Sequence, residues 1–292
     1  MNGDVVVGID GSWASCRAAQ WAAEEAARQG QALRVVHSSP LPVRTVPAPQ
    51  LPSPRQDGEE LMLRRMVSDL SLSHPGLKIL DTRHWDSPAA ALLDEAESAG
   101  LLVLGARGIG GFPGLLVGSV ALRLAGHARC PVVVTPASRP ADAGGGTAAA
   151  SPGEVVLGID ARDPADAVVE FAFDAARRRG VPLRAVHAWS LPAAFAPPPA
   201  LEIPESDRAT CEDLEVQLLS DALRRGRRDN PDVRVVLDVV LFNPAKAVVN
   251  ASTHAGLLVL GRAEGAGSDH PGPVAHAALH HAPCPVAIVP HG

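Results

Sequence analysis

The chain has 292 residues, a net charge of −6 and 46% hydrophobic residues, which is enough apolar material for buried cores. The acidic balance argues against a nucleic-acid partner, because such binding depends on neutralising phosphates with Lys and Arg. The two lysines, Lys78 and Lys246, do not follow a glycine loop, which excludes a Walker-type phosphate loop. No apolar run approaches the ~18 residues of a membrane span, and no charged-then-apolar leader opens the chain. We therefore expect a cytoplasmic protein without a membrane partner.

Apolar runs of strand length alternate with helical patterns along the first 135 residues. We expect strands near 4–9, 33–37, 77–84, 101–105 and 131–135, and helices near 14–29, 59–73, 88–98 and 118–127. Such an alternation predicts a parallel sheet with helices on both faces. The proline-rich segments 40–58 and 190–208 are expected to be long loops, which close over a ligand, dock a partner domain or form mobile surface.

A glycine-rich loop follows the expected strand 101–105. Its spacing is G-x2-G-x9-G-S, from Gly105 through Gly108 to Gly118 and Ser119. Glycines let the backbone approach a ligand closely, and the free N–H groups at the start of the next helix attract anions. The spacing therefore predicts a phosphorylated ligand, and the alternative is a flexible connection between a strand and a helix.

The second half of the chain repeats the first. Four segments recur about 150 residues later: 5–10 as 155–160, 34–37 as 184–187, 101–105 as 257–261, and 127–132 as 281–286. This period is too long for a solenoid. We predict a duplicated domain, with copies at 1–138 and 153–292 and a linker at 139–152 rich in Pro, Ala and Gly.

The second copy lacks the complete glycine loop. Glu264 occupies the position of Gly108, and Gly272-Pro273 lies opposite Gly118-Ser119. A carboxylate repels phosphate, and proline provides neither a hydroxyl nor an N–H donor. Although Asp160 is retained, we expect this copy to bind a triphosphate weakly or not at all.

These motifs together resemble the universal stress protein family in its tandem two-domain form. The resemblance rests on Val-Gly-Ile-Asp10-Gly-Ser, Leu-Leu-Val-Leu-Gly105, the glycine loop and Cys130-Pro-Val-Val-Val. It implies two α/β domains, each with a five-stranded parallel sheet in the order 3-2-1-4-5. It also implies ATP or a related adenine nucleotide as ligand, with Mg²⁺ as a possible companion, and a homodimer or a pseudo-symmetric pair of domains. The implied role is stress regulation rather than catalysis.

The resemblance also implies the residues of the nucleotide site. They are Gly8, Asp10, Val36, Gly105, Arg107, Gly108, Gly118, Ser119 and Val120. Asp10 is assigned to the nucleoside side, Val36 to a backbone contact with the base, and the loop glycines and Ser119 to the phosphates. In an open α/β sheet of the implied order, a ligand is expected beyond the carboxyl ends of strands one and four.

Arg107, Asp10 and His37 each have a second interpretation that involves no ligand. Arg107 either bonds a phosphate or is solvated, and Asp10 is a ligand residue or a turn or N-cap residue. His37 either lines the same crevice or is a satisfied core histidine.

Two other side-chain groups and two other functions fit parts of the sequence. His276, His280, His281 and Cys284 suggest zinc, but histidines also suit the last turn of a helix. The basic runs 177–179 and 224–228 fit solvated helix ends. Alternative functions are a nucleotide-free dimerising interaction protein and a slow ATP hydrolase, although no general base is evident.

Overall fold

The computed structural model describes residues 3–39, 54–108, 116–137, 153–190, 205–264 and 271–292. These described residues fall into two compact units, one ending at 137 and the other beginning at 153. None of their helices is long and apolar enough to cross a membrane.

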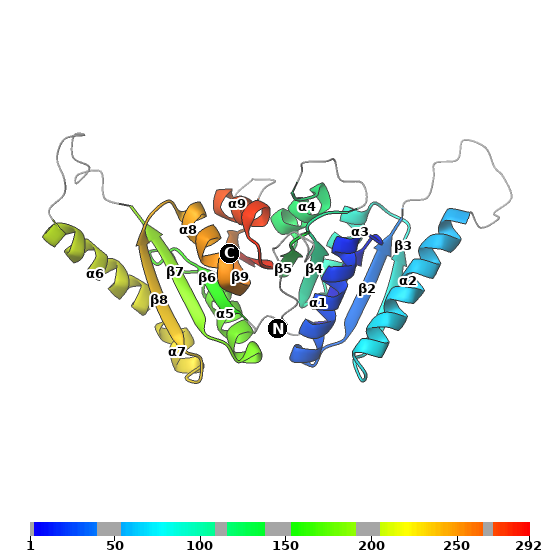
Figure 1. The fold of residues 1–292 in the computed structure, drawn as a ribbon, viewed down its shortest axis with the longest axis horizontal. Helices are drawn as coiled ribbons and strands as arrows, with labels where there is room; N and C mark the ends of the chain where they lie inside the picture. Colours follow the sequence, from blue (N-terminus) through cyan, green and yellow to red (C-terminus); the bar gives the residue numbers. More distant parts are fainter. Residues whose placement is uncertain (1–2, 40–53, 109–115, 138–152, 191–204, 265–270) are drawn as a thin grey trace, which may run out of the picture. The chain divides into compact units, whose positions relative to one another are not determined.

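The first unit is a parallel five-stranded sheet with helices on both faces (Figure 1). Its elements are β1 Val5–Ile9, α1 Trp13–Gln29, β2 Leu33–Ser38, α2 Pro54–Ser73, β3 Ile79–His84, α3 Pro88–Ala96, β4 Leu101–Gly105, α4 Ser119–His127 and β5 Val132–Thr135. The strand order is β3-β2-β1-β4-β5, and every neighbouring pair is parallel. Helices α1 and α2 pack together, as do α3 and α4. The predicted fold class is confirmed.

Local sequence explains how this unit is built. Strand β1 is buried along its whole length, which fits a strand with helices on both faces. Helix α1 begins after Ser12, whose side chain accepts the N–H of Ser15, and ends at Gly30 in the left-handed conformation with φ of 65°. The buried face of α1 is largely alanine, so the helix lies close against the sheet.

The second unit has the same topology. Its elements are β6 Glu154–Gly158, α5 Asp166–Arg179, β7 Leu183–Trp189, α6 Glu205–Ala222, α7 Arg224–Asp229, β8 Val235–Leu241, α8 Pro244–Ala251, a 3₁₀ turn Ser252–His254, β9 Ala255–Ala263, α9 Pro273–His281 and β10 Val286–His291. The order β8-β7-β6-β9-β10 matches that of the first unit strand for strand, again with parallel neighbours.

Two predictions about element bounds were wrong. The expected loop 40–58 is helical from Pro54, and the expected loop 190–208 is helical from Glu205. Proline at the first helical position is favourable, because its missing N–H would have no partner there. Residues 40–53 and 191–204 lie outside the described part of the chain.

The basic run 224–228 also differs from expectation. It belongs to a helix of its own, α7, rather than to the end of a longer one. Arg225 of this helix lies 3.1 Å from carboxylate oxygens of both Asp166 and Glu170 on α5. Arg225 thus contacts α5, while Arg224 and Arg228 are exposed, as expected of a solvated basic run.

Candidate functional site

A cavity of about 470 Å³ lies at the carboxyl ends of β1 and β4. These strands are neighbours, and the helices that follow them cover opposite faces of the sheet, so this is the point where the topology reverses direction. All nine residues predicted for the nucleotide site line the cavity: Gly8, Asp10, Val36, Gly105, Arg107, Gly108, Gly118, Ser119 and Val120. The structure therefore brings together residues from four separate segments of the chain.

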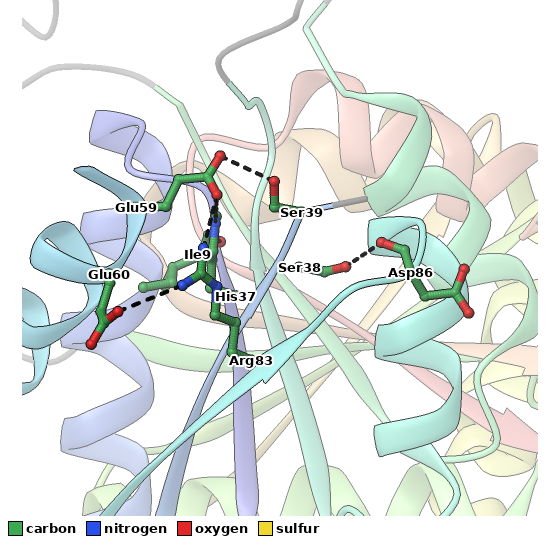
Figure 2. Close-up of polar contacts among 8 residues, drawn as sticks. All are labelled: Ile9, His37, Ser38, Ser39, Glu59, Glu60, Arg83 and Asp86. Atoms are coloured by element: carbon green, nitrogen blue, oxygen red, sulfur yellow. Dashed lines mark hydrogen bonds and ion pairs between the residues drawn. The ribbon is translucent and has the colours of Figure 1, made fainter. Parts of the chain in front are cut away.

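One wall of the cavity is formed by β2 and α3. Val36 and Ser38 line it from β2, and Pro88 and Leu92 line it from α3. The Ser38 hydroxyl donates to the Asp86 carbonyl at 2.6 Å, which joins the two elements beside the cavity (Figure 2). Sequence reasoning missed Ser38, Pro88 and Leu92. The period of two along a strand would have found Ser38, because it shares a face with Val36.

Asp10 forms a turn at the end of β1. Its Oδ1 accepts the N–H of Ser12 at 2.9 Å, and its own N–H donates to the Ser15 hydroxyl at 3.3 Å. The N-cap of α1 is Ser12, so Asp10 is not the cap residue. The second carboxylate oxygen, Oδ2, faces Gly108, where an added Cβ would overlap it. Asp10 and the glycine loop are thus in direct apposition, which neither position reveals alone.

The glycines of the cavity have different structural reasons. A Cβ at Gly105 would lie 2.7 Å from the carbonyl carbon of Ala14, so glycine is required where β4 meets α1. A Cβ at Gly8 would lie 2.8 Å from a methyl of Leu92. At Gly118 the nearest atom would be the Ala106 carbonyl oxygen at 3.6 Å, an ordinary contact. Protein packing explains the first two glycines but not Gly118.

The start of α4 faces the cavity. Gly118 is its N-cap and provides no side-chain cap, while the Gly118 N–H donates to the Ala106 carbonyl at 2.7 Å. The first helical hydrogen bond is made by the N–H of Leu122 at 3.1 Å. The N–H groups of residues 119–121 precede it, and such groups at a helix start attract anions.

Arg107 lines the cavity beside this helix start. Its carbonyl accepts the Ser12 hydroxyl at 3.3 Å, which attaches the glycine loop to the beginning of α1. Residues 109–115 of the predicted loop lie outside the described part of the chain.

His37 lies on the other face of β2, away from the cavity lining. Its Nδ1 is 2.9 Å from the Ile9 carbonyl oxygen, and its Nε2 is 3.8 Å from a carboxylate oxygen of Glu59 (Figure 2). The same carboxylate is held by Arg83 at 3.2 Å and by the Ser39 hydroxyl at 3.0 Å. The geometry supports the core interpretation of His37, and the contacts of Arg83 and Ser39 with Glu59 attach α2 to the sheet.

The second unit contains a corresponding cavity of about 390 Å³ at the ends of β6 and β9. Asp160, Val186 and Gly261 line it at the positions of Asp10, Val36 and Gly105. Its loop takes a different path, because β9 continues past Gly261 and pairs with β10 as far as His291.

The histidines of α9 do not form a metal site of three or more ligands, and no such group occurs within the described ranges. The rings of His276 and His280 lie 4.5 Å apart. Burial and the two neighbouring histidines lower the pKa of His280. Burial raises the pKa of the Cys284 thiol to about 12, so this group is a weak ligand in its usual protonated form.

Comparison with known proteins identifies the family. The model of the universal stress protein family matches residues 1–136 and again 153–290. The universal stress protein Rv2005c of Mycobacterium tuberculosis (strain ATCC 25618 / H37Rv) is 31% identical over 293 residues, which cover 97% of this chain and 96% of the relative. Rv2623 of the same strain, also a universal stress protein, is 31% identical over 270 residues, with 88% and 85% covered.

A solved structure agrees in fold. The crystal structure of a universal stress protein from Archaeoglobus fulgidus DSM 4304 has a TM-score of 0.68 at 17% identity, with 99% of this chain and 97% of that chain covered. The family match spans both halves, and both halves have the same strand order. The chain belongs to the universal stress protein family, as a tandem of two such domains.

Proposed function

We propose that the N-terminal unit binds ATP or a closely related adenine nucleotide, and that this cytoplasmic protein uses the binding to regulate a stress response. The observation that carries the proposal is the cavity itself. One end meets the uncapped start of α4, and the opposite wall is apolar. A volume of about 470 Å³ suits a small-molecule site, and the two ends differ as the phosphate and base ends of a nucleotide do.

The lining suggests an orientation for the nucleotide. The base would lie against the wall of Val36 and Leu92, with the ribose hydroxyls donating to Asp10. The phosphates would accept N–H groups from the start of α4 and a charge-assisted bond from Arg107. Any Mg²⁺ would arrive with the phosphates, since this ion is usually held by phosphate oxygens and water.

Binding without turnover is the role that the side chains favour. Among the described residues that line the cavity, the acidic or basic side chains are those of Asp10 and Arg107. Asp10 lies at the nucleoside end in this orientation, so it is badly placed to activate a water at the γ-phosphate. We therefore propose a regulator that binds and releases nucleotide rather than an ATP hydrolase.

The proposal is tested by Gly118→Val. The backbone at Gly118 has φ of −80° and ψ of 157°, an extended conformation that valine adopts readily, and the protein leaves room for a Cβ. The valine side chain would instead occupy the phosphate end. Equilibrium dialysis should show ATP affinity reduced tenfold or more, about 1.4 kcal/mol. Thermal unfolding without nucleotide is the control for the fold.

Two results would count against the proposal. Unchanged ATP affinity in Gly118→Val would show that the loop is not the phosphate site. Mass spectrometry of the denatured protein tests for co-purifying nucleotide. If none is found, and ATP does not stabilise the protein, a nucleotide-free interaction protein is favoured instead.

We also propose that the two copies form a pseudo-symmetric pair or that the chain forms a homodimer. A duplicated domain inherits any contact surface that its dimeric ancestor had. In each copy, the last strand of the five-stranded order follows a Cys-Pro pair. These strands are β5 and β10, and such edge strands need cover. Sedimentation equilibrium distinguishes the two arrangements, because a chain of 30.2 kDa that stays monomeric cannot use an interchain pair.

A further inference from the structure

The cavity of the second unit keeps the lining that corresponds to the nucleoside end of the first. Gly158, Asp160, Val186, Pro244 and Val248 line it, at the positions of Gly8, Asp10, Val36, Pro88 and Leu92 in the first unit. The turn at Asp160 is also kept, since its Oδ1 accepts the N–H of Arg162 at 3.0 Å, as Asp10 accepts that of Ser12.

The opposite end of this cavity is built differently. Strand β9 extends through Ala263, and the N–H of Glu264 donates to the His291 carbonyl at 2.7 Å. The residues that follow Gly261 are therefore committed to pairing with β10. In the first unit β4 ends at Gly105, and the chain turns toward Asp10.

An imidazole lies beside Gly261 in the second cavity. His291 lines the cavity, and its Nε2 would lie 2.9 Å from a Cβ at Gly261. Helix α9 begins with Pro273, which removes one of the N–H groups at its start. The helix start at this cavity thus has one N–H donor fewer than its counterpart, and an imidazole lines the cavity near Gly261.

The lining of the second cavity is also more acidic than that of the first. The charged side chains of the second cavity are those of Asp160 and Asp163, together with the titratable His291. The first cavity balances Asp10 with Arg107. Among the described residues, Asp163 has no acidic counterpart in the lining of the first cavity, and no cationic side chain takes the place of Arg107 in the second, so the second lining repels a polyphosphate.

From this lining we infer that the second cavity binds a neutral nucleoside, with adenosine as the probe, and rejects its phosphorylated forms. The choice of a nucleoside rests on the proposed function, because it takes the ligand of the first cavity to be an adenine nucleotide. One chain would then bind both the phosphorylated and the phosphate-free form of the same compound, each in its own unit.

A matched pair of variants separates the two cavities. Ser38 and Ala188 occupy equivalent positions, each two residues after the valine that lines the cavity wall. Ser38→Phe fills the first cavity and Ala188→Phe fills the second. By titration calorimetry, Ser38→Phe should lose ATP affinity tenfold or more and keep one adenosine site. Ala188→Phe should keep ATP binding and lose one adenosine site. In the double variant Ser38→Phe/Asp160→Asn, the affinity of the second cavity for adenosine should fall about tenfold.

A measurement on the unmodified protein covers the case in which a phenylalanine variant does not fold. Protein saturated with ATP should still bind one equivalent of adenosine. If it binds none, the inference is wrong, whereas ATP binding itself leaves the proposed function intact. If Ser38→Phe binds ATP as tightly as adenosine in an Asp160-dependent manner, the phosphate end is open and the inference also fails. If ATP does not bind the unmodified protein, the proposed function is wrong. Adenosine binding to Ser38→Phe then tests the inference separately.

Discussion

Gly105 and Gly118 belong to one sequence motif, but the structure gives them separate tasks. A side chain at Gly105 would collide with the backbone of Ala14, whereas one at Gly118 would meet only an ordinary contact. A glycine that the fold does not need is better explained by a ligand, because close approach of backbone to ligand is a main use of glycine. Under the proposed function, the motif thus combines a glycine required by packing with one that faces the ligand.

This difference predicts that two alanine variants lose different amounts of folding stability. Gly105→Ala should lower the free energy of unfolding by about 1–3 kcal/mol, as overpacking does. Gly118→Ala should lower it by less than about 1 kcal/mol, the usual cost of alanine at an N-cap. Urea denaturation without nucleotide measures both. Equal losses of stability would contradict the assignment of Gly118 to a ligand.

The cysteines should differ in reactivity by position. Burial raises the pKa of the Cys130 thiol to about 11 and that of Cys284 to about 12, so little thiolate is present near pH 8. Cys211 is half-buried and not in a disulfide. In the native protein a thiol reagent at pH 8 should modify Cys211 well before Cys130 and Cys284. Mass mapping of the labelled peptides measures the order, and all three should react alike after denaturation.

At the scale of elements, helices α2 and α6 are attached to their sheets by a shared device. A buried histidine at the end of the second strand faces a glutamate on the following helix: His37 with Glu59, and His187 with Glu215 at 3.2 Å. Glu215 also pairs with Arg162, from the loop after β6. This contact joins each helix, α2 or α6, to the strand that precedes it in the chain, β2 or β7.

Removal of one partner should therefore cost more than an ordinary surface change. Glu215→Ala leaves His187 buried beside an empty site, and the free energy of unfolding should fall by about 3 kcal/mol. Glu212→Ala, on an exposed position of the same helix, should change it by less than about 0.5 kcal/mol. Similar effects of the two substitutions in urea denaturation would show that the buried pair does not anchor α6.

The sequence predicted these elements with uneven success. Buried strands such as 101–105 are marked by continuous apolar runs, and Gly30 marks the end of α1, so local chemistry sufficed. The extension of β9 could not be foreseen, because it depends on pairing with β10 some thirty residues further along. The lining residues Pro88 and Leu92 were missed for a similar reason, since tertiary packing brings α3 to the cavity.

The nine site residues were predicted from the resemblance to the family, and the topology explains why they lie together. A doubly wound sheet brings the carboxyl ends of β1 and β4 together whatever the intervening residues are. The apposition of Asp10 and Gly108 was not predictable, as it depends on the path of the chain after β4.

At the scale of the whole molecule, the two cavities predict a local response to ATP. Nucleotide at 100 times its dissociation constant stabilises the bound state by about 2.7 kcal/mol, which corresponds to at most about 100-fold slower exchange of amides that open only in the free protein. Hydrogen exchange should slow at residues 119–121 of α4 and stay unchanged at 274–275 of α9. Equal protection of both helices would mean that both units bind ATP.

The extended pairing of β9 with β10 bears on how this protein can evolve. Placing serine at position 273 would return one hydroxyl and one N–H, yet His291 would still line the cavity and Glu264 would still pair with β10. Removing His291 alone would free space but leave the chain on the wrong path. Under the proposed function, neither substitution alone would make the second cavity equivalent to the first, so each intermediate would gain no ATP binding for selection to keep. The difference between the two copies is therefore not readily reversed by single substitutions.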